Sequence, residues 1–342
     1  MRVLGIDTTA DDTCAAVVED GKNILSNVIF SQSNLHEKYG GIVPQIASRE
    51  HLKNVIPTVD SCLKEAGVKF SDVGLIAVGQ SPDKALSYYH IGITTAQMFA
   101  YALKIPLVGV DHMEAHIFAN VAIFPDLSFP FISLTASGGH TLLVLVTNFG
   151  EYKILGSTLD DAAGEAFDKV ARLLGLAYPG GPSIDAAAAN GSAKAYRFPR
   201  PMKSHKGYDF SYSGLKTSVY LKVKELEKER GGNLSSSQVA DVAASFREAV
   251  VDSLLIKAFR AVEEFNIERL VLGGGVAANE LIRNEAVKRG EAVGVKVYYP
   301  PKPLCTDNAV GTATLGYFQF KKKGPDDVFK LPYFRKSPLE KW

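Results

Sequence analysis

Short apolar runs separated by polar turns open the chain and predict a meander of β-strands. The runs occupy residues 3–7, 14–19 and 24–30 and are rich in apolar and β-branched side chains, which is typical of strands. The turns between them lie at residues 8–13 and at Asp20-Gly21. The first part of the chain is therefore predicted to form three short neighbouring strands.

Helical spacing of apolar positions follows this meander. Residues 48–66 carry apolar side chains at intervals that place them on one face of a helix, with Pro57 expected to bend it. A predicted strand at 73–79, a helix at 91–103, a strand at 107–110 and a helix carrying HMEAH come next. This alternation indicates a mixed or parallel sheet covered by helices.

The same order of elements recurs in the second half. Strand-like runs at 131–135, 142–147 and 152–155 are again divided by short turns, and Thr13 and Thr141 take equivalent places in the two copies. Further predicted elements are helices at 161–174 and 235–265, strands at 269–272 and 295–298, and helices from Ala278 and Asp307. The repeat suggests two related lobes that hold a ligand between them, unless the similarity of the runs is coincidental.

Composition narrows the class of protein. The 342 residues suggest about two domains. A net charge of +1 excludes a strongly basic nucleic-acid coat, so any contact with nucleic acid must be a local patch. The apolar runs fall short of a membrane helix, no signal peptide is recognisable, and the three cysteines form no CxxC motif. We expect a soluble cytoplasmic protein without a disulfide framework or a contact with membranes.

The sequence HMEAH suggests a metal site. His112 and His116 are four residues apart, so on a helix both imidazoles reach one ion. Met113 follows the first histidine, so the HExxH pattern of zinc proteases is absent. A carboxylate would complete a site suited to zinc or iron, and Asp307, just before a predicted helix, is the candidate. Two ordinary helix histidines are the alternative interpretation.

Two glycine-rich segments are candidates for binding a nucleotide. In SLTASGGHT, Gly138 and Gly139 allow backbone N–H groups to turn toward an anion, although a plain hairpin turn explains the segment as well. In LGGGVAAN, the glycines permit close approach of a nucleotide, with Asn279 able to hydrogen-bond a base or ribose. Tight packing of a strand on a helix is the alternative for this second segment.

Acidic residues near turns are further candidates. Asp7, Asp11 and Asp12 could hold a metal or orient an attacking group, or could simply form a solvated turn. Asp168 and Asp185 lie near the glycine turn YPGGPSID and suit ribose hydroxyls or a metal. Capping of helices explains these last two residues equally well.

A basic and aromatic segment spans residues 194–216. Cations beside aromatic rings suit phosphate and an unstacked RNA base, while a packed or solvated loop is the alternative. The cations are Lys194, Arg197, Arg200, Lys203, Lys206 and Lys216, and the interleaved rings are Tyr196, Phe198, Tyr208, Phe210 and Tyr212.

Ten motifs, in this order, together resemble the TsaD family, and the second of them resembles its bacterial branch. They are GIDTTADDT, YGGIVPQIASREH, HMEAH, SGGHT, DDAAGEAFDK, YPGGPSID, FPRPM, DFSYSGLKT, GGGVAAN and CTDN. The match is spread over almost the whole chain. The resemblance implies an α/β fold of two ribonuclease-H-like lobes of the actin/hexokinase/Hsp70 (ASKHA) type with a ligand cleft between them. We assign the lobes to residues 1–121 and 122–306, the second with a helical insertion, and expect residues 307–342 to pack back on the first.

The resemblance also implies an activity and partners. The family transfers a threonylcarbamoyl group from threonylcarbamoyl-AMP to the N6 amine of the adenosine 3′ of the anticodon, in tRNAs reading ANN codons. In bacteria it works with a paralogous TsaB-like subunit and a small TsaE-like ATPase, while a separate synthase makes the adenylate.

Site residues follow from the same resemblance. His112, His116 and Asp307 are implied to bind one divalent metal ion, iron or zinc. The implied contacts to the donor substrate are Thr135, Ala136, Ser137, Gly138, Gly139, Asp168, Gly181, Asp185 and Asn279. Our own hypothesis is that Asp12 orients or deprotonates the attacking amine, with Asp7 and Asp11 as the other candidates.

Two departures from the family pattern keep rival functions open. Residues 80–89 lack the glycines that the family usually has there, and Asp12 replaces a longer Glu. One rival is an ATP-dependent kinase of small substrates on the same fold, which leaves HMEAH unexplained. The other is a non-catalytic nucleotide-binding scaffold, which the altered segment favours.

Overall fold

The computed structural model describes residues 1–39, 41–81, 87–334, 337 and 339. The chain divides into two compact units. Unit 1 comprises Met1–Ser128 and Pro300–Trp342, and unit 2 comprises Phe129–Tyr299. Each unit is built on one five-stranded sheet. The segment whose glycines are missing, 80–89, is described only in part, because residues 82–86 lie outside the described residues.

The sheet of unit 1 begins with the predicted meander. Strands β1 (Arg2–Thr9), β2 (Asp12–Glu19) and β3 (Asn23–Ser31) pair antiparallel, and β4 (Val73–Gln80) and β5 (Leu107–Asp111) continue the sheet parallel to β1. The strand order is β3-β2-β1-β4-β5. β1 and β2 are buried along almost their whole length, as expected where helices cover both faces.

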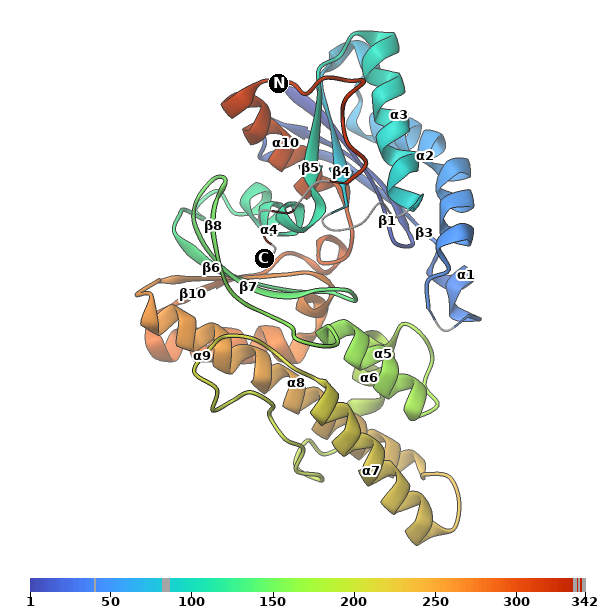
Figure 1. Cartoon of the computed structure of the whole chain (residues 1–342), viewed down its shortest axis with the longest axis vertical. Helices are drawn as coiled ribbons and strands as arrows, with labels where there is room; N and C mark the ends of the chain where they lie inside the picture. Colours follow the sequence, from blue (N-terminus) through green and yellow to red (C-terminus); the bar gives the residue numbers. More distant parts are fainter. Residues whose placement is uncertain (40, 82–86, 335–336, 338, 340–342) are drawn as a thin grey trace. The chain divides into compact units, whose positions relative to one another are not determined.

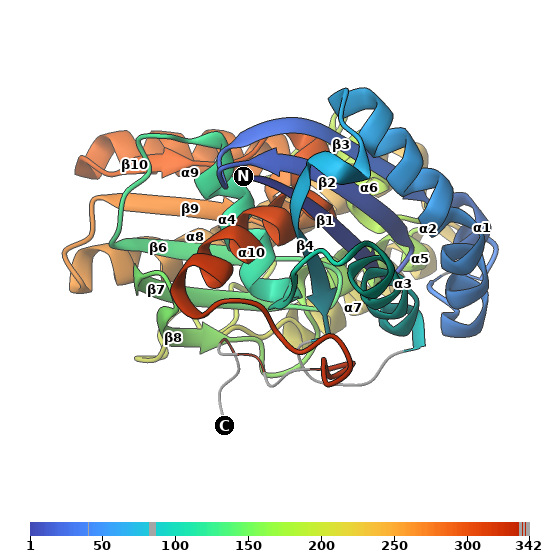
Figure 2. The same cartoon turned by 90° about the horizontal axis from the view of Figure 1, so that it is seen from above.

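Helices cover the two faces of this sheet (Figure 2). α10 (Ala309–Lys323) packs on one face, and α2 (Pro44–Ala66) and α3 (Ser87–Leu103) pack on the other. Pro57 lies inside α2, which runs through it without interruption. Two short helices, α1 (Ser33–Glu37) and η1 (Phe70–Asp72), complete this part of the unit.

α4 (His112–Ile123) lies along α10, and this contact is unusually close. A Cβ atom at Gly311 would collide with the backbone carbonyl of Ala115. Only glycine lets the two helix backbones come this near. The turn before α10 is thereby held beside the first turn of α4.

Unit 2 repeats the sheet of unit 1. Strands β6 (Phe131–Ala136), β7 (Thr141–Asn148) and β8 (Glu151–Ser157) form an antiparallel meander, and β9 (Arg269–Gly273) and β10 (Lys296–Tyr298) add in parallel. The order β8-β7-β6-β9-β10 is the order of unit 1 with each strand replaced by its counterpart. The predicted repeat is therefore confirmed at the level of topology.

The helices of unit 2 include two that the apolar pattern did not predict. These are α6 (Gly180–Ala188) and α7 (Ser213–Arg230), whereas α5 (Ala163–Leu173), α8 (Ser236–Glu264) and α9 (Glu280–Val293) were predicted. Two 3₁₀ turns, η2 (Gly275–Ala278) in unit 2 and η3 (Lys302–Leu304) in unit 1, complete the elements. Figure 1 shows the long helix α8 beneath the sheet of unit 2 with α7 beside it.

Candidate functional site

Two histidines enter the interior of unit 1 from the first five residues of α4. The helix begins directly after β5, where the Asp111 carboxylate accepts a hydrogen bond from the Glu114 N–H at 2.9 Å and caps the helix. The four-residue spacing places His112 and His116 on one face, with ring centroids 4.6 Å apart. Both side chains are buried. Their imidazoles therefore face the same region of unit 1.

The carboxylate of Asp307 lies beside both imidazoles. Its Oδ1 is 3.2 Å from Nε2 of His116 and 3.5 Å from Nε2 of His112. Asp307 immediately precedes Asn308, the N-cap of α10. Burial alone would raise the pKa of Asp307, but the two neighbouring imidazoles hold it well below its usual range.

The donor atoms of these three residues fit a divalent transition metal. They all lie within 4.8 Å of one another. Two imidazole nitrogens and one carboxylate oxygen are a donor set found at zinc and Fe(II) sites. We call His112, His116 and Asp307 the His-Asp group.

Asp7 holds His112 from the other side of its ring. Oδ2 of Asp7 lies 3.2 Å from Nδ1 of His112 and accepts a hydrogen bond from the Thr312 hydroxyl at 3.0 Å. Oδ1 accepts a hydrogen bond from the Thr9 hydroxyl. Asp7 is fully buried, so its carboxylate is a partner of His112. Sequence reasoning did not find this pairing, because the two residues are 105 positions apart.

The other two acids of the first turn differ in their surroundings. Asp12 is the first residue of β2, opposite Ser31, and its Oδ1 is buried without a hydrogen-bond partner among the described residues. Burial, followed by the negative charge of Asp307, raises the pKa of Asp12 to about 7. Asp11 is half-buried, and its backbone carbonyl accepts a hydrogen bond from Gln32. Asp12 therefore combines an uncommitted oxygen with a charge that changes near neutral pH.

The glycine turn of unit 2 leaves free space beside its backbone. The turn joins β6 to β7, with the Ser137 N–H donating to the carbonyl of His140 at 2.8 Å. A Cβ atom at Gly138 or Gly139 would meet no atom within 4 Å. α5 begins beside this turn, since the Gly164 N–H donates to the Ser137 carbonyl at 3.1 Å. The glycines are thus not required by packing, and the space next to them can take a ligand.

Thr135 and Ala136, at the end of β6, are buried. At Ala136 the chain meets the second glycine segment. Gly274 has φ +77°, and a Cβ atom there would collide with the Ala136 carbonyl. Gly274 is therefore needed for close approach of the two backbones, which is the packing interpretation of LGGGVAAN. The helix expected from Ala278 begins instead at Glu280, after η2.

Asp168 lies beside the other glycine turn. Its Oδ1 accepts a hydrogen bond from the Gly180 N–H at 2.7 Å, and burial raises its pKa. A Cβ atom at Gly180 would collide with the backbone of Asp168, whereas one at Gly181 would meet nothing within 4 Å. The first of these glycines therefore serves packing, and the second has open space beside it.

Asp185 and Asn279 are hydrogen-bonded to each other. Nδ2 of Asn279 donates to Oδ1 of Asp185 at 2.6 Å, while Oδ1 of Asn279 caps α9. Arg247 also donates to Oδ1 of Asp185, at 3.2 Å. Arg247 was missed from the sequence, since no motif links it to a residue 62 positions away.

The basic and aromatic segment 194–216 does not have the structure expected of a surface on which RNA bases stack. Phe198, Phe210 and Tyr212 are buried in the core of unit 2, so they cannot stack on an RNA base. Lys216 pairs with Asp161, and Arg200 pairs with Asp252 and Glu248. The idea that all these rings and cations face a ligand is therefore wrong, because packing within unit 2 uses three of the five rings and ion pairs use two of the six cations.

Comparison with known protein families decides which family the chain belongs to. The model of the family described as "TsaD: tRNA N6-adenosine threonylcarbamoyltransferase" matches residues 23–314. The chain belongs to the TsaD family. It is accordingly a transferase of the tRNA-modifying class, as the motifs predicted.

Curated relatives agree with this assignment over almost the whole chain. TsaD-family proteins from Kosmotoga olearia and Thermosipho africanus, both named tRNA N6-adenosine threonylcarbamoyltransferase, are 45% and 46% identical to it. The first alignment covers 97% of this chain and 98% of the relative, and the second covers 94% and 95%. The chain therefore spans essentially the full length of these TsaD relatives.

Solved structures support the fold of this TsaD-family chain. HypF from T. kodakarensis gives a TM-score of 0.60 at 16% identity, covering 94% of this chain and 48% of that chain. Component A of the Acidaminococcus fermentans (R)-2-hydroxyglutaryl-CoA dehydratase gives 0.55 at 15% identity, covering 93% and 98%. These proteins share the ASKHA fold, which confirms the predicted fold class. No helix within the described residues has the length and apolar character needed to cross a bilayer.

Proposed function

We propose that this chain transfers the threonylcarbamoyl group from threonylcarbamoyl-AMP to the N6 amine of the adenosine 3′ of the anticodon, with a divalent zinc or iron ion held by the His-Asp group. The observation that carries the proposal is the convergence of three donor atoms within 4.8 Å in unit 1. Family membership supports the reaction class. In this reaction N6 attacks the carbamoyl carbon of a mixed anhydride, and AMP leaves.

We assign the metal to the His-Asp group because its three donor atoms suit such an ion and because a neighbouring residue holds one of its rings in place. Nε2 of His112, Nε2 of His116 and a carboxylate oxygen of Asp307 would be the ligands. A bound ion of this kind acts as a Lewis acid toward an acyl oxygen. Asp7 fixes the ring of His112 and so the direction of its Nε2.

Unit 2 is assigned to the AMP half of the donor. Open space beside Gly138 and Gly139 suits a phosphate approached by backbone N–H groups. Such groups stabilise negative charge on the departing phosphate without reorganising during the reaction. Gly181 and Asp168 are assigned to the nucleoside, where Oδ2 of Asp168 would accept a hydrogen bond from a ribose hydroxyl.

Asp12 is assigned to the attacking amine. Its buried Oδ1 has no hydrogen-bond partner among the described residues, and a pKa of about 7 suits a group that accepts a proton near neutral pH. Asp7 is a positioning residue in this scheme, because His112, Thr9 and Thr312 surround its carboxylate.

The partners follow from charge and from the family. A net charge of +1 is modest for a protein that must hold a polyanion alone. We therefore propose that a TsaB-like paralogous subunit and a TsaE-like ATPase act together with this chain on the tRNA. The cytoplasm is the proposed location, because tRNA is the substrate and all three cysteines are free.

Reconstitution tests this function. The chain would be incubated with the partner proteins, the adenylate synthase, threonine, bicarbonate, ATP and unmodified tRNA, and the digested RNA analysed by mass spectrometry. We expect threonylcarbamoyladenosine from the wild type and a loss of at least 100-fold in the His112→Ala/His116→Ala variant. Lys22→Ala, which removes an exposed side chain of unit 1, is the control and should retain activity.

The alternatives predict different products. A small-molecule kinase would transfer phosphate from ATP to a small acceptor and leave the tRNA unchanged. A non-catalytic scaffold would bind the adenylate without turnover. Either result, or full activity and metal content in the double histidine variant, would contradict the proposal.

A further inference from the structure

The irregular segment 192–207 runs alongside helix α8 in unit 2. The Ser192 N–H donates to Asp241 at 2.7 Å, and the Tyr196 N–H donates to Ser245 at 3.1 Å. Farther along, Nη2 of Arg200 donates to Asp252 at 2.9 Å. The partners on α8 advance in the same order as the segment, so the two run in the same direction.

Two cations on α8 hold the far end of the segment. Nζ of Lys257 donates to the carbonyls of His205 and Gly207 at 3.2 and 2.6 Å, and Arg260 donates to the His205 carbonyl at 2.9 Å. The Lys257 side chain is buried. From Asp241 to Arg260 the axis of α8 rises about 28 Å, and the segment is anchored over this distance.

The anchored segment presents unpaired positive charge. Residues 193–207 contain no Asp or Glu. Lys194, Arg197, Lys203 and Lys206 are exposed, and none of them forms an ion pair within the described part of the chain. We call these four residues the basic stripe. Arg200 is excluded from it, because Asp252 and Glu248 neutralise its charge.

We propose that the basic stripe binds the phosphate backbone of the tRNA substrate. The inference rests on the proposed function, since it names where unit 2 contacts that RNA. Cations fixed on a rigid support are suited to phosphates, whose contacts position a nucleic acid without reading its sequence. An acidic protein partner fits less well, because protein interfaces have apolar centres and none of the Tyr, Phe or Met side chains of 192–207 is exposed.

Salt dependence of tRNA binding tests the stripe. The Lys194→Gln/Arg197→Gln/Lys203→Gln/Lys206→Gln variant would be compared with wild type, each as the full chain with its partner proteins. Each lost phosphate contact lowers the slope of log K against log salt by about 0.7 to 0.9. We expect the slope to fall by about 3, affinity at low salt to fall at least tenfold, and KM for tRNA to rise while kcat is retained.

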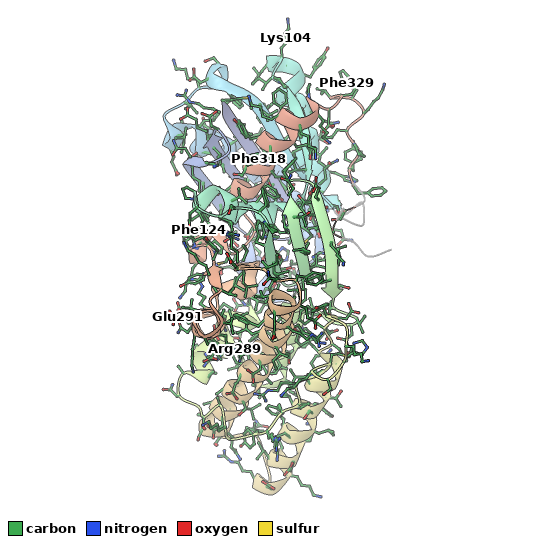
Figure 3. All side chains as sticks on the ribbon, turned by 90° about the vertical axis from the view of Figure 1, so that its left-hand side faces the viewer. Lys104, Phe124, Arg289, Glu291, Phe318 and Phe329 are labelled. Atoms are coloured by element: carbon green, nitrogen blue, oxygen red, sulfur yellow. The ribbon has the colours of Figure 1, made fainter. Side chains whose placement is uncertain are left out.

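A matched control removes the same charge elsewhere. Lys22, Lys69, Lys104 and Lys321 are exposed lysines of unit 1, and Lys104 projects from the surface in Figure 3. Their joint change to Gln should alter the slope by less than 1. Changing Lys194, Lys203 and Lys206 to Arg should preserve binding, because the charges remain.

The outcomes separate the two proposals. Suppose that wild type forms threonylcarbamoyladenosine but the stripe variant keeps the wild-type slope and KM. The proposal that the basic stripe binds tRNA is then wrong, and the proposed function is retained. If wild type forms no product, the proposed function fails independently of any effect of the stripe variant on the slope. If the variant loses a partner protein while its slope is unchanged, the stripe contacts protein and the RNA assignment is overturned.

Discussion

Nδ1 of His112 lies 3.2 Å from Oδ2 of Asp7, and this contact leaves Nε2 of the same ring facing Asp307. A carboxylate on the far nitrogen of a metal-binding histidine fixes the tautomer and makes the ring a better donor. The Asp7 carboxylate is itself held by Thr312 and Thr9. The orientation of His112, a ligand in the proposed metal site, is therefore set by β1 and α10 as well as by its own helix.

Replacing Asp7 should weaken metal binding. We expect Asp7→Asn to lower affinity for zinc or iron by about 10- to 100-fold, because the amide cannot match the carboxylate as a partner for His112. Competition with a chelator of known affinity measures the effect. Asp60→Asn, on an exposed part of α2, is the control. Unchanged affinity in Asp7→Asn would remove its positioning role.

The contact between α4 and α10 should control assembly of the His-Asp group. In Gly311→Ala the new methyl group collides with the Ala115 carbonyl, so we expect a loss of about 1 to 3 kcal/mol in the free energy of unfolding and weaker metal binding. Denaturant unfolding and metal analysis measure the two effects. Gly214→Ala adds the same methyl group where no atom lies within 4 Å and should not destabilise the protein.

Asp12 should make stability depend on pH in the metal-free protein. Its pKa is raised from 3.8 to about 7, so the folded state holds the proton more tightly than the unfolded state. The contribution of this proton to the free energy of unfolding is fully present below pH 3.8 and is lost as the pH rises through 7. We expect Asp12→Asn to be more stable than wild type at pH 8, by up to about 4 kcal/mol.

The low-pH comparison is the internal check on this prediction. Near pH 4 the carboxyl of Asp12 is protonated in the folded state and resembles the amide, so the difference from Asp12→Asn should shrink. A difference that is the same at pH 4 and pH 8 would show that burial of Asp12 does not govern it. At neutral pH the variant should also form less threonylcarbamoyladenosine.

A substitution in the glycine turn of unit 2 should weaken binding of the donor substrate without lowering the stability of the protein. Because space is open beside Gly139, Gly139→Val should change the free energy of unfolding by no more than about 0.5 kcal/mol. The added side chain occupies the position assigned to phosphate, so KM for threonylcarbamoyl-AMP should rise at least tenfold. Gly232→Val, also with open space, should leave both quantities unchanged. A normal KM in Gly139→Val would place the phosphate elsewhere.

Replacing Lys257 should loosen the anchored segment 192–207 without removing the exposed charges of the basic stripe. Lys257→Met loses the hydrogen bonds to the carbonyls of His205 and Gly207. We expect trypsin to cleave after Lys203 or Lys206 at least fivefold faster under native conditions. Lys224→Met, on the exposed side of α7, is the control, and equal cleavage rates in the two variants would show that Lys257 is not an anchor.

Most of the fold could be predicted from the apolar pattern. The equivalent positions of Thr13 and Thr141 marked the repeat that both sheets share. Helix α7 was missed because its second half, KVKELEKER, is dominated by charged side chains. In such a helix the apolar face is narrow, and the signal comes from buried positions such as Val219 and Val223.

The residues of the His-Asp group could be predicted from the sequence, whereas the contacts that hold them could not. Two histidines four apart can be read from one helix, but the role of Asp7 depends on Thr312, which is 305 positions away. For the rings of Phe198 and Tyr212 the sequence left two interpretations open, because an aromatic side chain beside cations suits RNA and a core equally. Tertiary burial decided between them, and no local pattern encodes that choice.

The placement of α10 has a consequence for synthesis on the ribosome. Unit 1 starts the chain, but its last helix and Asp307 are translated after all of unit 2. A nascent chain therefore carries both histidines long before their carboxylate partner emerges, and one face of its first sheet stays uncovered until then. If the His-Asp group holds the metal as proposed, we expect stable loading only on chains completed through α10, and a truncated product should be both metal-poor and exposed to proteolysis.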